Sequence, residues 1–461
     1  MAGLHLQLQK ILSRDSFSST LWAYMYAGIN SAGPLILSIL GILVLGGISL
    51  WAVDRPVHII QFYVSVTYLF ACSLVITGAV QLYFTRYISD RLFDRCQECI
   101  LPSFNAICLV TTAVTGSLGL ILAFTLFRHE SALYRMLMLS GFVILSNIWI
   151  GVTFLASIKR YGTIIKGFVL GYAVVLLVAY ILAGKGLNGL LAGFVTGHFV
   201  LLLFLALLIH RDYDSETYIS ADIFDRKASY PVLILVGLFF NAGVWADKFM
   251  FWFSEAGHQV IGPLHASVIY DIPVFIAYLC IIPGMAVLLL RVETEFIQKY
   301  DAFYHAVRQG GALGEIRMWR NDMVLAARSC IYDIFKVQAM VVLLIFAFGD
   351  KLLNAIGVSS LYFPMLKVDV IGVSLQMVLL GILNFMFYLD KRRHALLLTF
   401  LFMFLNIVLT RVSLELGPAY YGYGFGGALL LDVLLGMFLL NGRFEQLEYE
   451  VYMLQDNAGT A

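Results

Sequence analysis

An acid and a base stand side by side in an apolar run of this chain, NAGVWADKFMFWF, at residues 241–253. Asp247 and Lys248 are consecutive, so on a helix their Cβ atoms point about 100° apart and do not face each other. An ionisable side chain inside a membrane usually faces protein or a water-filled cavity. We therefore expect the two charges not to pair with each other, and we expect Asp247 to contact a neighbouring helix.

The base in this run belongs to a wider pattern. Asn241, Trp245, Lys248 and Trp252 follow one another at i, i+4, i+7 and i+11, which is one stripe of a helix. Aromatic faces stack on sugar rings, while amide and ammonium groups hydrogen-bond to hydroxyls. We predict that this stripe lines a translocation pathway for sugar. The alternative is that the tryptophans mark the membrane interface and that the lysine reaches up to it.

Four further charges interrupt apolar runs in the second half of the chain: Asp333, Lys336, Asp369 and Asp432. The first two are three residues apart and can pair along one helix, and the lysine can also reach the interface. Asp369 stands at the entry to its run, where a helix start favours an acid. Asp432 lies among leucines without a local partner, so it must find one on another helix or be protonated. All four are candidates for coupling or for helix contacts.

A possible break lies in the first apolar run, in AGINSAGP at residues 27–34. Gly28 and Gly33 loosen the backbone, and Pro34 removes a hydrogen-bond donor. Such a break suits a helix that alternates between two states. Close helix packing through small residues explains the same pattern equally well.

Catalytic motifs find little support. Asp212 and Asp214 form a DxD pair, but in a short polar segment where a solvated acidic loop is the simpler interpretation. Cys96 and Cys99 form a single CxxC, a weak signal for zinc or redox chemistry, and no second pair accompanies it. There is no Walker motif and no histidine cluster with metal spacing. We predict a protein that is not an enzyme and that uses no cofactor or metal.

These side chains must be positioned by membrane-spanning helices. The chain of 461 residues is 61% hydrophobic and only 13% charged, with a mean hydropathy of +0.87. Soluble domains carry about 25% charged residues. The net charge of +1 gives no reason to expect a nucleic-acid partner. The composition predicts an all-α polytopic membrane protein.

Stretches of about 20 apolar residues, long enough to span a bilayer, recur twelve times. The clearest polar break falls between the sixth and the seventh, and matching halves suggest two pseudo-symmetric six-helix bundles around a central cavity. The predicted parts are an interfacial lead at 1–20, a first bundle at 21–210, a linker at 211–229, a second bundle at 230–441 and a tail at 442–461. One side of the membrane carries roughly three times as many Lys and Arg residues as the other, so both termini, the linker and the tail should be cytoplasmic.

Several longer runs together resemble one family. They are the lead MAGLHLQLQKILSRDS with YAGINSAGP, the run RYISDRLF after the second span, NAGVWADKFMFW, and YDIPVFIAYLCIIPGMAVLLLRVETEF. The chain resembles the Pel exopolysaccharide transporter family (PelG-like proteins) of the multidrug/oligosaccharidyl-lipid/polysaccharide exporter superfamily. The lead departs from the usual glycine-containing opening of that family, which leaves the role of the first residues open.

The resemblance implies twelve helices in two bundles with a V-shaped cavity, in the bacterial inner membrane. It also implies a substrate, the cationic Pel polymer rich in N-acetylgalactosamine and galactosamine, which is exported to the periplasm for the biofilm matrix. The implied partners are a cytoplasmic glycosyltransferase that uses UDP-sugars and other inner-membrane Pel proteins, including a cyclic-di-GMP receptor.

Two alternatives stay open at this point. One is an ion-coupled flippase or small-molecule exporter of the same fold that protonates Asp247 or Asp432. The other is a membrane scaffold that assembles a polysaccharide synthase without conducting.

Overall fold

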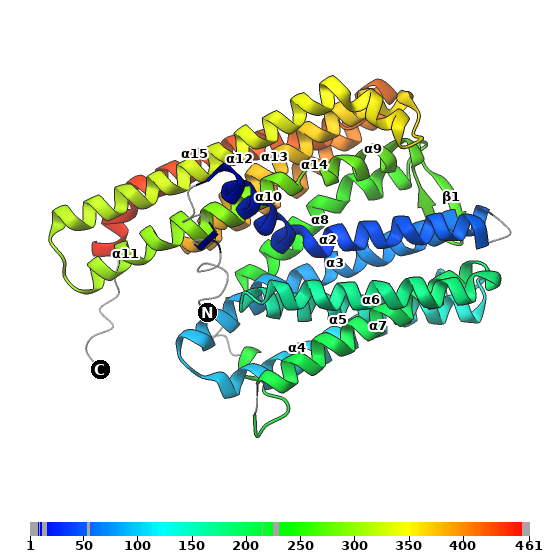
Figure 1. The fold of residues 1–461 in the computed structure, drawn as a ribbon, viewed down its shortest axis with the longest axis horizontal. Coiled ribbons are helices and arrows are strands. Elements are labelled where there is room, and N and C mark those ends of the chain that lie inside the picture. The colour runs from blue at the N-terminus through cyan, green and yellow to red at the C-terminus, as the bar shows by residue number, and fades with distance from the viewer. Residues whose placement is uncertain are drawn as a thin grey trace. The chain divides into compact units, whose positions relative to one another are not determined.

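Long apolar helices make up almost all of the chain (Figure 1). The structure, a computed structural model, describes residues 8, 10–11, 16–52, 56–213, 215–224 and 230–453. Within these residues, eleven helices are long and apolar enough to cross a membrane, and twelve if the bent first helix is counted as one span. The chain is a multi-pass membrane protein, and the all-α prediction is confirmed. Most of the predicted lead lies outside the described residues.

The packing divides the described chain into two compact units, with unit 1 comprising residues 30–271 and unit 2 the residues up to 29 and from 272 onward. Helix α2 (Phe17–Ala52) contributes to both units. The remaining long helices of unit 1 are α3 (Pro56–Phe93), α4 (Ile100–Thr125), α5 (Ala132–Ser157), α6 (Tyr161–Leu182), α7 (Leu187–Asp212) and α8 (Val232–Trp252). Short helical turns lie at η1 (Gln97–Cys99), η2 (Ala183–Lys185) and η3 (Asp222–Phe224).

The seventh span, α8 (Val232–Trp252), belongs to unit 1. Helix α8 lies against α3, where Gly237 meets Gly78 so closely that a Cβ on Gly237 would overlap the Gly78 carbonyl oxygen. Loop polarity separates the halves at 211–229 and places this helix in the second bundle. The packing boundary instead falls after Asp271, in the first turn of the following helix. Loop composition reports where the chain leaves the membrane, and it does not report which helix a span packs against.

A small β-hairpin follows α8, which the sequence did not lead us to expect. Strand β1 (His258–Ile261) pairs antiparallel with β2 (Leu264–Ala266) around Gly262, whose φ of +49° favours glycine. The Tyr68 hydroxyl of α3 donates to the His265 carbonyl at 3.1 Å. The strands are too short to show an alternating pattern in the sequence.

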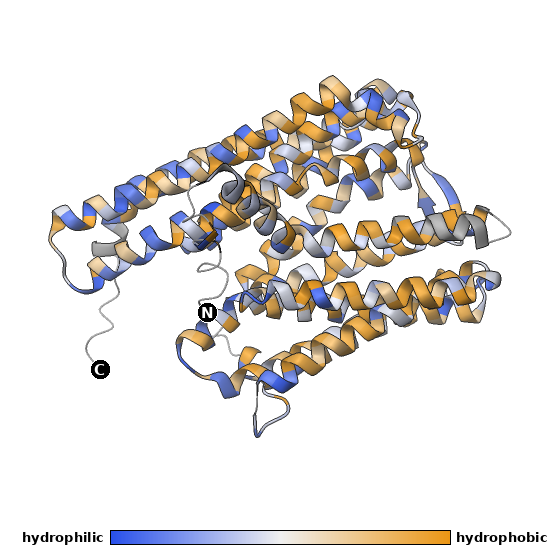
Figure 2. Ribbon diagram, in the orientation of Figure 1, coloured by the Kyte–Doolittle hydropathy of each residue, from blue (hydrophilic) through white to orange (hydrophobic). Residues whose placement is uncertain are grey.

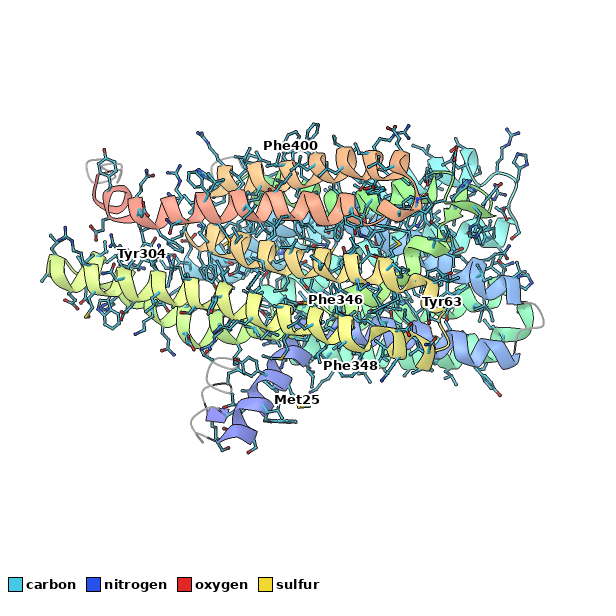
Figure 3. All side chains as sticks on the ribbon, turned by 90° about the horizontal axis from the view of Figure 1, so that it is seen from above. Met25, Tyr63, Tyr304, Phe346, Phe348 and Phe400 are labelled. Atoms are coloured by element: carbon cyan, nitrogen blue, oxygen red, sulfur yellow. A yellow bond between two sulfur atoms is a disulfide. The ribbon has the colours of Figure 1, made fainter. Side chains whose placement is uncertain are left out.

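Unit 2 begins within α9 (Val268–Leu279), which breaks before α10 (Ile282–Arg291) and continues through a π-helical turn (η4, Val292–Phe296) into α11 (Ile297–Arg308). The rest of the unit consists of α12 (Leu313–Ala355), η5 (Ser360–Tyr362), α13 (Phe363–Tyr388), α14 (Arg392–Leu416), η6 (Pro418–Tyr420) and α15 (Tyr423–Met453). In Figure 3, all side chains of the described residues are drawn on these helices. Phe346 and Phe348 of α12 and Phe400 of α14, labelled there, are exposed, as a lipid-facing surface requires.

Helix α12 is too long for the membrane alone. Its 43 residues span about 64 Å at 1.5 Å per residue, whereas the hydrocarbon core of a bilayer is about 30 Å thick. Its first turns are hydrophilic in Figure 2 and are tied to the end of α15, where Arg320 lies 2.8 Å from Glu448. Helix α15 thus continues well past residue 442, where the sequence had placed the start of a tail.

Candidate functional site and its buried charges

Asp247 and Lys248 pair with each other. The lysine Nζ lies 3.1 Å from Oδ1 and 3.0 Å from Oδ2 of the carboxylate, and it also donates to the Val244 carbonyl at 2.9 Å. Both side chains are buried. The prediction that they would not pair is wrong, because it considered only the directions of the Cβ atoms. The four-carbon stem of lysine lets its ammonium group curl back to the preceding residue.

A second layer of polar contacts surrounds this ion pair. The hydroxyl of Tyr270, fully buried on α9, donates to Asp247, which is the contact with a following helix that we expected of this acid. Asp271 accepts from Trp252 Nε1 at 2.8 Å and from the Ser267 backbone at 3.0 Å. The available sequence signal for Asp271 was an acid in the first turn of a helix, where it can accept from a free backbone N–H group. Asp271 is a site residue that our reading of the sequence missed.

The stripe on α8 faces α3 within unit 1. Trp252 stacks on Tyr68 with ring centroids 4.5 Å apart, and only 2% of its surface is exposed. Asn241 donates to the Gly237 carbonyl at 2.9 Å and packs against Gly78. Trp245 is half-buried, 6.3 Å from Trp252 between ring centroids. The stripe therefore exists as one face, but Trp252 and Lys248 are held in the interior, and the pathway role of the four stays a prediction.

Helix α2 bends at the predicted break. The segments Ser18–Pro34 and Ile36–Ile42 meet at 59°. Gly28 packs toward Ala286 in unit 2, where an added Cβ would lie 3.4 Å from the alanine Cβ. Gly33 packs on Ile165 in unit 1, where the corresponding distance is 3.0 Å. A bend and close packing, the two alternatives of the sequence analysis, therefore occur together, and each glycine serves a different unit.

Asp333 and Lys336 pair along α12 as predicted, with Nζ 3.3 Å from Oδ1. A third partner was missed, because Arg291 at the end of α10 reaches the other oxygen of Asp333 at 2.7 Å. Arg291 also pairs with Glu295 inside the π-helical turn. Lys336 is more than half exposed, so this cluster joins α10 to α12 at a polar edge.

Asp369 does not begin its helix. Helix α13 starts at Phe363, so the acid lies beyond the first turn, where the interaction with the helix dipole has faded. Our interpretation of Asp369 as a helix-start acid is therefore wrong. The side chain is fully buried next to Gly422, where an added Cβ would approach Oδ1 to 2.7 Å. Gly422 has a φ of +84° and gives this carboxylate its room.

Asp432 lacks a local partner within the described residues, as its leucine neighbours predicted, and its role in coupling or helix contact stays a prediction. The side chain is fully buried on α15, and neither carboxylate oxygen makes a hydrogen bond to any residue that the structure describes. Ionised carboxylates in hydrocarbon are costly without a partner.

The residues of the weaker motifs form local contacts. Cys96 and Cys99 form a disulfide at the start of α4. Asp212 of the DxD pair ends α7 and pairs with Arg160 and Arg211, while Asp214 lies outside the described residues. In the described part of the chain, no three His, Cys, Asp or Glu side chains gather as metal ligands.

This arrangement of helices is similar to that of solved transporters of the MOP superfamily. An outward-facing multidrug resistance MATE family transporter of the MOP superfamily is similar with a TM-score of 0.63 and 15% identity, over 92% of this chain and 96% of the other. A MOP superfamily transporter from Pyrococcus furiosus gives a TM-score of 0.60 and 16% identity, over 92% and 96%. An inward-facing MATE transporter gives 0.56 and 14%, over 88% and 95%. At these identities the likeness shows the fold alone.

The family is shown by the sequence along nearly its whole length. Residues 1–452 match the family model PelG, whose description is "Putative exopolysaccharide Exporter (EPS-E)". The chain therefore belongs to the PelG family of exopolysaccharide exporters, as the resemblance predicted. No curated protein matched the chain.

Proposed function

We propose that this protein moves the Pel exopolysaccharide, rich in N-acetylgalactosamine and galactosamine, from the cytoplasm to the periplasm across the bacterial inner membrane. The observation that carries the proposal is the match to the exopolysaccharide exporter family over residues 1–452. The MOP-type fold supports it, since the similar structures are transporters. On this proposal the chain transports a polymer that another protein makes, and it catalyses no reaction itself.

The proposed partner is a cytoplasmic glycosyltransferase that builds the polymer from UDP-sugars, with other inner-membrane Pel proteins, among them a cyclic-di-GMP receptor. The asymmetry of Lys and Arg residues supports cytoplasmic termini. Helices α11, α12 and the end of α15 would then extend from the cytoplasmic side, where a polymerising enzyme works. Their ion pairs, such as Arg320 with Glu448, give this extension a fixed shape.

Within the α8 stripe, Asn241 and Trp245 are the members proposed to meet the sugar. Both are half-buried, whereas Trp252 and Lys248 are bonded in the interior of unit 1. Asp247, Lys248 and Tyr270 then act as positioning residues that hold α8 against α9 and keep the stripe in place.

The test is reconstitution into liposomes, with and without the glycosyltransferase, while polymer entry into the lumen is followed with a glycan-specific probe. We expect entry only when both proteins and UDP-sugars are present. Trp245→Ala should reduce entry, and Trp22→Ala, an exposed tryptophan on α2, is the matched control. Entry without the transferase would contradict the proposal, and a stable complex that passes no polymer would favour the scaffold.

A further inference from the structure

Asp432 differs from the other acids of unit 2 whose contacts are described above. Its carboxylate is fully buried and has no hydrogen-bond donor among the described residues, whereas Asp333 has two cationic partners. It lies near the middle of the apolar stretch 421–441, with Leu431 and Leu434 exposed on the outer side of the helix. A group in this position is stable in its protonated form and costly in its ionised form.

Close contacts of glycines define which residues surround Asp432. Gly424, two turns before it, meets Thr410 of α14, and Gly436, one turn after it, meets Leu398. Helices α14 and α15 are therefore antiparallel, and Asp432 lies at a level between Leu398 and Thr410. On α13, Gly372 meets Phe425 of α15, and Ile382 meets Gly436. The segment of α13 between Gly372 and Ile382 therefore lies beside Asp432.

No other titratable side chain lies at this level on the three helices. Between Asp369 and Tyr388 on α13, between His394 and Arg411 on α14, and between Tyr423 and Arg443 on α15, Asp432 is the only one. Helix α12 meets α15 farther along, through the ion pairs of Arg317 and Arg320 with Glu448 and the hydrogen bond of Arg328 to Asn441. On these three helices, therefore, no charged side chain at the level of Asp432 balances its carboxylate.

A row of buried polar side chains lies on α14 on both sides of the level of this carboxyl group. Thr399, Asn406, Thr410 and Ser413 are all buried and follow at i, i+7, i+11 and i+14, on one face. The Thr410 hydroxyl donates to Asn406 Oδ1 at 3.0 Å. Thr399 lies on the predicted cytoplasmic side of Asp432, and the other three lie on the predicted periplasmic side.

The row ends near a second acid. The buried Asp369 of α13 stands beside Gly422, two residues before Gly424, the glycine that meets Thr410. Buried carboxyl groups of this kind form proton relays in pumps and transporters. Hydroxyl and amide groups between them offer hydrogen bonds to a water chain.

We propose that Asp432 is a proton-binding site, reached along the polar face of α14, and that its loading and release couple polymer export to a proton gradient. This inference rests on the proposed export function and adds an energy source to it. A hydronium ion gives its proton to one Oδ of Asp432 and leaves as water. Release to water on the other side reverses this step, so only O–H bonds form and break.

The experiment uses the full chain in liposomes and two measurements. Infrared difference spectra between alkaline and acidic buffer should show the C=O band of a protonated carboxyl group, and Asp432→Asn should lose that band. With the glycosyltransferase and UDP-sugars present, an imposed proton gradient should accelerate polymer entry in the wild type and not in Asp432→Asn. Asp432→Glu should retain both responses, because it keeps the carboxyl group.

Asp333→Asn is the matched control, since its carboxylate has Arg291 and Lys336 as partners, and it should retain both the band and the response to the gradient. A band and a gradient response that persist in Asp432→Asn would overturn the inference. If the wild type exports no polymer at all, the proposed function fails. The loss of the C=O band in Asp432→Asn then still tests whether Asp432 binds a proton. If export needs the transferase but ignores the gradient, coupling is excluded while the proposed function stands.

Discussion

Unit 1 and unit 2 each bury an aspartate in a membrane-spanning helix, and they treat it in opposite ways. Asp247 of α8 accepts hydrogen bonds from Lys248 and Tyr270, so its charge is balanced where it lies. Asp432 of α15 is equally buried and has no such donor among the described residues. Burial is therefore the same at the two sites, and the difference between them lies in the hydrogen-bond and ion-pair partners of each aspartate.

The sites of Asp247 and Asp432 should therefore have different roles. Asp247 has two donors, one of which is its ion-pair partner Lys248, and the other, Tyr270, ties α8 to α9. A carboxyl group without partners changes its proton occupancy at little structural cost, because no contact depends on its charge. The same chemical substitution at the two positions should thus have very different effects.

Asp247→Asn should give the largest effect. Removing the carboxylate leaves the Lys248 ammonium buried without its counter-ion, and breaking a buried pair in this way costs about 3–5 kcal/mol. Unfolding in mixed micelles, followed by circular dichroism, measures this loss. The double variant Asp247→Asn with Lys248→Met should recover most of it, because no charge remains unpaired. A single variant as stable as the wild type would mean that the pair is not a structural element.

Gly237→Ala should give the next effect, by separating α8 from α3. A Cβ there overlaps the carbonyl oxygen of Gly78, and overpacking costs about 1–3 kcal/mol. The matched control is Gly426→Ala in unit 2, where no atom lies within 4 Å of the added Cβ. In that helix the substitution should stabilise by about 0.5–1 kcal/mol. Equal shifts of the unfolding midpoint in the two variants would show that α8 does not pack on α3 as described.

Tyr270→Phe should give a smaller loss of about 1–2 kcal/mol, because Asp247 loses one donor and keeps Lys248. The same unfolding measurement applies. Tyr332→Phe, on the exposed side of α12, provides the control. If the two substitutions have the same effect, the hydroxyl of Tyr270 contributes nothing to the buried network.

The spans were predictable because each needs about 20 apolar residues, and a run of that length is visible in the sequence. The lack of a local partner for Asp432 was also predictable, since its leucine neighbours offer no donor, but whether another helix supplies one was left open. The pairing of Asp247 with Lys248 was not, because spacing rules describe Cβ directions and ignore a flexible stem. Nor was the place of α8 in unit 1, which depends on a contact between Gly78 and Gly237 that no local pattern announces.

Asp432→Asn should give the smallest change in stability, and this is the sharpest test of the comparison. An amide has nearly the shape of a protonated carboxyl group, and no ion pair or hydrogen bond to the described residues is lost. We expect the free energy of unfolding to stay within about 0.5 kcal/mol of the wild type, measured beside Asp247→Asn under identical conditions. A loss comparable to that at Asp247 would mean that Asp432 is ionised and paired. The distinction between a fixed charge in unit 1 and an exchangeable one in unit 2 would then collapse.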